Sequence, residues 1–308
     1  MPGIAQSLKQ ELPLWRYFFW DIPCWAAGWR SQHRWQRIQS ALQKDAFTLK
    51  NSLQRFYADK ANTVDIENAV NKALLIRVIR NSEAYSCLGM SKNKVQKDFT
   101  VTGIEHLHRA KEQNRPVILL TAHMGSFYSL PILLAPYGFR LNTVARTVDN
   151  SYFNPLPQQL FERLNYRLTG ARMPGRYVYT NYSNKMDRYI VTACKENDTL
   201  LVLPDIPRKF LPSNRCSVQF LGKKSSLPGR IIDLGLKYNA VFLTVWSTFE
   251  LEPNFSFMRH LYVDPPITAT DKKEILQYYA DRLSNIVYQQ PWQWLGSMII
   301  SQYNEETG

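Results

Sequence analysis

The sequence contains few cysteines, and none of the patterns in which cysteines build a fold. Only four occur in 308 residues, at Cys24, Cys87, Cys194 and Cys216, widely spaced and without a Cys-x-x-Cys pair. This usage excludes a disulfide-rich scaffold and a cysteine-based zinc module. We therefore expect buried thiols in a reducing compartment.

The sequence also lacks an uninterrupted apolar run long enough to span a membrane. Its most aromatic stretch, residues 12–29, reads LPLWRYFFWDIPCWAAGW and is interrupted by Pro13, Arg16, Asp21 and Pro23. A charged residue near the centre of a bilayer costs about 2.5–3.5 kcal/mol, and proline breaks helical continuity. No basic segment followed by an apolar one marks a signal peptide. A spanning helix is therefore not expected here.

What this stretch does contain favours a position at a membrane surface. Tryptophan and tyrosine prefer the level of the lipid head groups, and basic residues follow directly at Arg30, Arg34 and Arg37. We interpret residues 1–34 as an aromatic interfacial segment that anchors the chain to a membrane in a peripheral or monotopic manner. The alternative is an aromatic flap that packs over the core of the following domain.

Acidic residues are scarce relative to basic ones. Lysine and arginine number 38 against 25 aspartates and glutamates, so the formal net charge is +13. This balance favours anionic partners such as acidic lipid head groups or an acidic carrier protein, although solubility alone also accounts for it. No nucleic-acid-binding motif accompanies the charge, so nucleic acid is not an expected partner. His106 and His108 lie two apart on an expected helix and share no face. No metal site and no cofactor are predicted.

The apolar pattern indicates an α/β fold. An apolar face recurs over residues 35–56 and again over 66–74, which predicts two helices. From residue 99 onward strands alternate with helices, with strands expected at 99–102, 117–121, 140–145, 199–203, 217–220, 240–248 and 257–263, and helices at 103–110, 154–168, 186–196, 230–238 and 271–288. Such alternation is typical of a mixed, largely parallel sheet flanked by helices. Since no linker divides it, residues 35–308 are predicted to form a single α/β domain with a helical amino-terminal extension, and the strand 257–263 to close the sheet.

The segment PVILLTAHMGSFY, residues 116–128, carries the strongest functional signal. A buried-strand pattern brings His123 to the end of a strand, and a short helix is expected just after it. In α/β folds ligands bind at the carboxyl ends of the strands, so we expect the imidazole in an open crevice. Histidine suits proton transfer near neutral pH, because its ordinary pKa is about 6.5.

This segment resembles the His-x-x-x-x-Asp/Glu motif of glycerolipid acyltransferases, in particular the lipid A late-acyltransferase family, which has His-Phe-Gly-Asn-Trp-Glu. Other blocks resemble that family in the same order, namely VTGIEH at 101–106, TVAR at 143–146, LVLPD at 201–205, VQFLG at 218–222 and QPWQWLG at 290–296. The resemblance implies a glycerolipid acyltransferase-like fold and acyl transfer with His123 as the general base.

The chain departs from the family at Tyr128, which stands where the family has its acid. A phenol with an ordinary pKa of about 10 is neutral at pH 7 and gives the histidine no negative partner. Three alternatives follow. A carboxylate from elsewhere serves, with Asp149 and Asp205 the best placed; Tyr128 suffices for a slower reaction or a more nucleophilic acceptor; or the site is inactive. The candidate catalytic residues are His123, Tyr128 and Asp205.

Four further residues are predicted to bind substrate. The resemblance implies that Arg146 holds an anionic group, for which a planar guanidinium is suited, with an arginine exposed at a strand end as the alternative. Arg208 belongs to a basic cluster that could meet phosphates, although a solvated loop would look the same. Gly125 and Ser126 adjoin the histidine. Because Ser126 lacks a Gly-x-Ser-x-Gly context, we expect it to help start the helix rather than act as a nucleophile.

These features together predict an acyltransferase at the cytoplasmic face of a bacterial inner membrane. The resemblance implies acyl carrier protein or acyl-CoA as donor, and a hydroxyl or amine of an amphipathic lipid, glycolipid or lipopeptide as acceptor. The alternative is a lipid-binding or scaffold protein that kept the fold and lost catalysis. The two differ in whether turnover of an acyl donor depends on His123.

Overall fold

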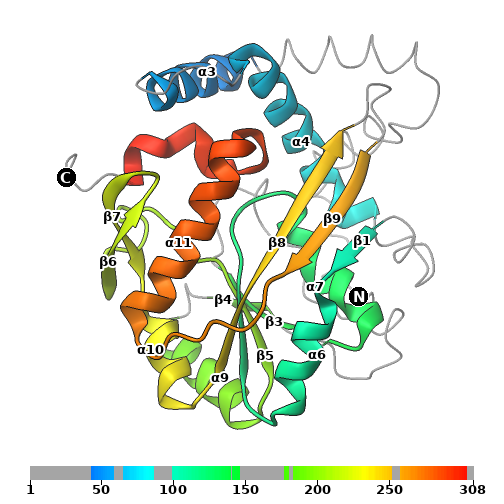
Figure 1. Cartoon of the computed structure of the whole chain (residues 1–308), viewed down its shortest axis with the longest axis vertical. Coiled ribbons are helices and arrows are strands. Elements are labelled where there is room, and N and C mark those ends of the chain that lie inside the picture. Colours follow the sequence, from blue (N-terminus) through cyan, green and yellow to red (C-terminus); the bar gives the residue numbers. More distant parts are fainter. Residues whose placement is uncertain are drawn as a thin grey trace, which may run out of the picture.

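A computed structural model describes residues 43–58, 65–86, 99–139, 141–145, 177–179, 183–251 and 257–303. The predicted anchoring segment 1–34 and the predicted helix 154–168 lie outside these ranges. The first described elements are two helices, α3 (Gln43–Tyr57) and α4 (Ile66–Ser86), which lie across the top of Figure 1. They confirm the two predicted amino-terminal helices, and α4 extends well beyond its predicted end.

A seven-stranded sheet forms the centre of the protein (Figure 1). Its strand order is β1-β9-β8-β2-β5-β3-β4, and every neighbouring pair is parallel except β8 and β9. The strands are β1 (Phe99–Thr102), β2 (Val117–Leu120), β3 (Leu141–Ala145), β4 (Tyr177–Tyr179), β5 (Thr199–Val202), β8 (Val241–Leu251) and β9 (Phe257–Val263). This confirms the predicted α/β class with a mixed, largely parallel sheet. The expectation that residues 257–263 close the sheet is wrong, because β9 pairs on both sides.

Both faces of the sheet are buried, which explains the continuous apolar runs of its central strands. In β2, Val117 and Leu119 pack into one core cluster while Ile118 and Leu120 pack into the other, and none of the four is exposed. The first cluster is covered by α6 (Ile104–Glu112) and α7 (Leu130–Leu134), and the second by α9 (Ser183–Lys195), α10 (Arg230–Lys237) and α11 (Lys272–Gln289).

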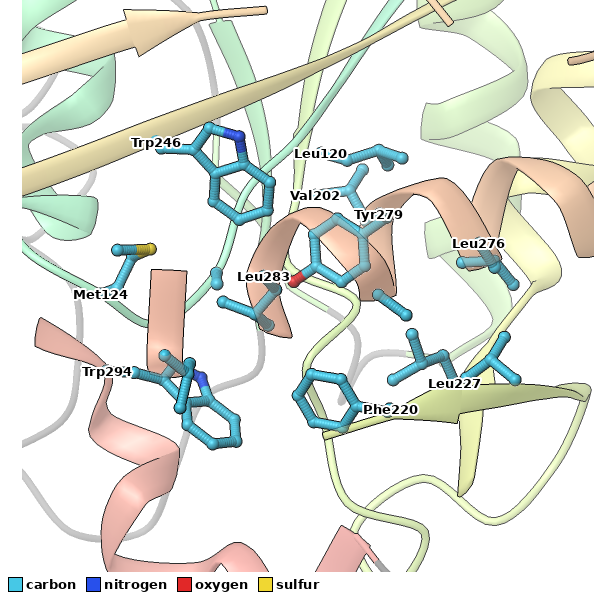
Figure 2. Close-up of a cluster of buried hydrophobic side chains, with 14 of the residues drawn as sticks. Leu120, Met124, Val202, Phe220, Leu227, Trp246, Leu276, Tyr279, Leu283 and Trp294 are labelled. Carbon is cyan, nitrogen blue, oxygen red and sulfur yellow. The ribbon is translucent and has the colours of Figure 1, made fainter. Parts of the chain in front are cut away.

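The second cluster also reaches the carboxyl-terminal part of the chain. Figure 2 shows Leu120 from the sheet, Tyr279 and Leu283 from α11, and Trp294 from the segment after α11 in one apolar cluster. Fully burying a large apolar side chain stabilises a fold by about 1.5–3 kcal/mol. Burial of this kind therefore fixes the segment after α11 against the end of the sheet.

A two-stranded hairpin, β6 (Arg215–Phe220) with β7 (Lys223–Pro228), packs against α11. The sequence indicated β6 but not β7. Only Leu221 and Gly222 connect the strands, and both have positive φ, 53° and 77°, as the tightest hairpin turns require. Leucine rarely adopts this conformation. Here Leu221 is buried in the core, with 7% of its surface exposed, and its backbone N–H donates to Ser284 Oγ at 3.0 Å, which offsets the strain.

Candidate active site

His123 lies just beyond the carboxyl end of β2, where α/β sheets bind ligands. Its side chain is 32% exposed, so one edge of the ring meets solvent. The ring contacts Phe127 edge-on, with 5.0 Å between the centroids. A short 3-10 turn, η2 (Phe127–Ser129), and then α7 follow, which agrees with the helix expected after the histidine.

Asp205 is the carboxylate that the fold brings to this histidine. It follows β5, the strand next to β2, and its side chain is only 1% exposed. Its Oδ1 lies 2.8 Å from His123 Nδ1, and its Oδ2 accepts the His123 backbone N–H at 2.8 Å. A carboxylate only accepts hydrogen bonds, so the pairing places the ring proton on Nδ1 and leaves Nε2 with a lone pair. Nε2 has no hydrogen-bond partner among the described residues.

Two aromatic side chains hold Asp205 from its other sides. Trp294 donates its indole N–H to Oδ2 at 2.8 Å, and Tyr303 donates its hydroxyl to the Asp205 carbonyl at 2.9 Å. Burial, and next the nearby Asp205 charge, raise the pKa of Tyr303 well above its ordinary value. The hydroxyl therefore stays protonated and remains a donor. The Trp294 hydrogen bond goes to a charged group, and such a bond contributes about 1.5–3 kcal/mol.

The backbone of the histidine segment is fastened to the segment after α11, which contains η5 (Pro291–Gln293) and η6 (Leu295–Tyr303). The Leu295 N–H donates to the His123 carbonyl at 2.8 Å, and the Gly125 N–H donates to the Gln293 carbonyl at 3.0 Å. Buried Arg80 of α4 bridges the same two segments, donating to the carbonyls of Gly125 and Gln293, each at 3.0 Å. The position of the imidazole is thus fixed by three elements that lie far apart in the sequence.

Gly125 and Ser126 are both buried in this structure. Gly125 has a φ of +48°, and a Cβ at this position would lie 1.9 Å from the Ser247 carbonyl oxygen. The Ser126 N–H donates to Ser247 Oγ at 3.0 Å, and Ser126 has no exposed surface. Substrate binding by Gly125 and Ser126 stays a prediction, and it would require a surface that is covered in this structure. Ser126 does precede η2, as expected, but without a side-chain capping hydrogen bond.

The other predicted site residues are either exposed or not fully described by the structure. Arg146 and Asp149 lie outside the described residues, and only the backbone of Tyr128 is described, within η2. Arg208 is exposed on the turn that follows Asp205. This turn is held by Arg215, which donates to the carbonyls of Ile206 at 2.9 Å and Leu211 at 2.8 Å.

Sequence reasoning missed the residues that support the pair. Trp294 and Gln293 lie in the QPWQWLG block, whose resemblance to the family was visible but assigned no role. The Gln293 side chain is fully buried, where it accepts from the Phe249 N–H at 3.0 Å and donates to the Phe249 carbonyl at 2.6 Å. Arg80 lies among the buried apolar residues of α4. A charged residue at such a position is the sequence feature that could have indicated its structural role.

No metal-binding group of histidine, cysteine or carboxylate side chains occurs in the part of the chain that the structure describes. In the same part, none of the helices combines the length and the apolar character needed to cross a bilayer. What the site offers chemically is one imidazole with a free lone pair and a buried carboxylate behind it. That combination accepts a proton and stabilises the imidazolium that forms.

A comparison with curated protein sequences finds no significant match. A family model does match, over residues 44–303, and this span contains β1 to β9, the pair His123 and Asp205, and the segment that fastens them. Its description is bacterial lipid A biosynthesis acyltransferase, and the chain belongs to this family.

Proposed function

We propose that the protein transfers a fatty acyl group from acyl carrier protein or acyl-CoA to a hydroxyl or amine of an amphipathic acceptor, with His123 as general base and Asp205 as its carboxylate partner. Membership of the family supports acyltransferase activity. The observation that carries the proposal is the 2.8 Å contact of His123 Nδ1 with Asp205 Oδ1, combined with a ring that is one-third exposed. Although Tyr128 replaces the acid of the family motif, His123 therefore still has a negative partner, Asp205.

The reaction follows from this arrangement. His123 Nε2 takes the proton of the acceptor O–H or N–H as that atom attacks the carbonyl carbon of the thioester donor. The new C–O or C–N bond forms, the tetrahedral intermediate collapses, and the C–S bond breaks. The imidazolium then gives its proton to the departing thiolate. Asp205 keeps the Nδ1 proton in place and stabilises the charged ring in between.

The acceptor is proposed to be a lipid, glycolipid or lipopeptide at the cytoplasmic face of a bacterial inner membrane. The family is a membrane-associated one in lipid biosynthesis. A net charge of +13 favours approach to anionic lipid head groups and to an acidic carrier protein. The anchoring role of residues 1–34 and the anion-binding roles of Arg146 and Arg208 belong to this proposal.

The test is turnover of an acyl-carrier thioester by the purified full chain, with and without amphipathic acceptors. His123→Ala and Asp205→Asn are each expected to reduce turnover by at least about 10²-fold, the usual contribution of general-base catalysis. His108→Ala, an exposed histidine on α6, is the matched control and should leave turnover unchanged. Turnover by wild type that does not exceed the spontaneous rate would favour the lipid-binding or scaffold alternative, and equal turnover above that rate by wild type and His123→Ala would exclude His123 as the base.

A further inference from the structure

A groove with a volume of about 610 Å³ lies on the surface between α3, the β6–β7 turn, the end of α11 and η6. This volume is in the range of about 300–1,000 Å³ that small-molecule sites occupy. From α3 it is lined by six residues at positions 47, 48, 51, 52, 55 and 56, which form one face of the helix. At 1.5 Å per residue, this face runs for about 14 Å. The groove is therefore elongated.

The walls of the groove are ordered by contacts between distant elements. Phe56 stacks on Tyr288 of α11 with 5.5 Å between the ring centroids and an interplanar angle of 6°. The Tyr57 hydroxyl donates to the Tyr288 carbonyl at 3.1 Å, and the Ser52 hydroxyl donates to the Ser297 carbonyl at 2.7 Å. A cavity formed by fixed walls binds a ligand without the cost of ordering them.

Much of the lining is apolar although the groove is open to solvent. Phe47 is 69% exposed, which is unusual for a side chain of that size, and Met298 and Ile300 of η6 line the same groove. Exposed apolar surface gathered in a concave site is typical of a binding site rather than of ordinary surface. The apolar lining indicates a ligand with a hydrocarbon part.

The charged side chains of the groove are all positive. Arg55 and Lys223 are lining residues, and no acid is among them. Arg55 precedes Phe56, which stacks on Tyr288. Lys223 follows Gly222, where an added Cβ would lie 3.2 Å from the Tyr288 hydroxyl. Both cations therefore follow or precede, in sequence, a residue that lies against Tyr288, and both line the groove. No salt bridge engages either of them within the described ranges.

The groove is distinct from the reaction centre. Neither His123 nor Asp205 lines it. Asp205 is instead surrounded by aromatic residues that do not line the groove: Trp294 donates to its carboxylate, and Phe220 contacts Trp294 at 5.6 Å and Tyr303 at 5.5 Å between ring centroids. A ligand in the groove therefore does not contact the catalytic pair through the lining residues.

We propose that this groove is a second lipid site that binds a long-chain fatty acid, with its carboxylate against Arg55 and Lys223 and its hydrocarbon chain along the face of α3 that carries Phe47. A carboxylate accepts charge-assisted hydrogen bonds from arginine and lysine, and the elongated apolar face matches an extended hydrocarbon chain. The inference does not depend on catalysis at His123.

Calorimetric titration of the full chain with myristate below its micelle concentration tests the proposal. Myristyl alcohol, which has the same chain without the charge, should bind about tenfold more weakly, which corresponds to about 1.4 kcal/mol. The double variant Arg55→Gln/Lys223→Gln should lose the same factor for myristate and none for the alcohol. Lys195→Gln/Lys237→Gln, which removes two exposed cations outside the groove, is the matched control and should bind as wild type does.

A second variant tests the apolar part of the groove. Asn51→Trp places a bulky side chain in its middle from the surface of α3 and should abolish myristate binding without lowering the melting temperature. A myristate analogue with a photoreactive diazirine should label peptides that contain residues 43–57 or 295–303. Absence of binding, equal binding of acid and alcohol, labelling confined to other peptides, or tighter binding of lysophosphatidylglycerol than of myristate would each overturn the proposal.

Discussion

His123 and Asp205 stand at the same level of two neighbouring parallel strands. Leu120 of β2 pairs with Val202 of β5, and each of the two site residues follows its strand partner by three positions. The register of the sheet thus sets their separation, and the helix that follows His123 is not needed to bring an acid to the ring. In the motif that the family uses, the acid comes from five positions after the histidine, where this chain has Tyr128.

Because the carboxylate comes from β5, the Tyr128 hydroxyl is expected to be dispensable. Tyr128→Phe should retain turnover within about threefold of wild type, since Asp205 supplies the charged hydrogen bond to the ring, worth about 1.5–3 kcal/mol. Steady-state turnover of the acyl-carrier thioester measures this. A loss as large as that of Asp205→Asn would contradict the assignment and favour the tyrosine as the partner of His123.

Trp294→Phe should slow catalysis while leaving substrate affinity in place. The change keeps an aromatic ring but removes the N–H that bonds to Asp205 Oδ2, which frees the carboxylate to turn away from His123. We expect kcat to fall by about tenfold or more, with KM changed little, because the lost hydrogen bond is to a charged group. Trp292→Phe is the control, since Trp292 is partly exposed beside Lys72. A rise in KM at constant kcat would show that Trp294 acts in binding instead.

Gly125→Ala should destabilise the fold severely. The added Cβ would lie 1.9 Å from the Ser247 carbonyl oxygen, which neither backbone can relieve without displacing β8 or the His123 segment. Gly138→Ala is a matched control, with a φ of +89° and nothing within 4 Å of the added Cβ. Its free energy of unfolding should fall only by the backbone cost of about 1–2 kcal/mol. Chemical denaturation compares the two, and similar losses would show that Gly125 is needed for its φ alone.

Asp264 gives the protein a pH-dependent contribution to stability. Burial raises the pKa of Asp264, but hydrogen bonds from Arg282, Thr244 and Trp246 lower it by more, so the net pKa lies below its ordinary value. A carboxyl group of this kind stabilises the fold fully above its unfolded pKa, near 4, and loses that contribution as the pH falls through its folded pKa.

The free energy of unfolding should therefore decrease from about pH 5 downward. Arg282→Gln removes the charged donor, so this variant should be less stable at pH 7 and should lose less on acidification than wild type. Urea unfolding between pH 3 and 7 measures both, with Lys237→Gln on the surface of α10 as control. Parallel pH profiles for wild type and Arg282→Gln would show that the Asp264 pair does not contribute.

The sequence predicted the elements whose signal is local. The apolar run of β2, the helices around it and the position of His123 at a strand end follow from hydrophobic periodicity. The turn between β6 and β7 was missed because Leu221 adopts a positive φ that is stabilised by tertiary burial, not by local preference. The position of β9 inside the sheet depends on long-range pairing with β1, which no local pattern encodes.

The site shows the same division. Asp205 could be nominated from sequence as one of two possible remote acids, because it follows a predicted strand. Choosing it over Asp149 requires knowing that β5 lies beside β2 and in which register. The roles of Trp294 and Arg80 depend on where α4 and the segment after α11 pack, and these contacts span more than 40 residues of chain.

The residues that complete the site are synthesised after the pair that they support. A ribosome releases His123 and Asp205 well before residues 293–303, which supply the indole, the tyrosine hydroxyl and the carbonyl that complete their surroundings. A nascent chain thus carries both reactive groups without the parts that align them. We therefore expect the proposed reaction centre to become aligned only after the segment following α11 has emerged and docked.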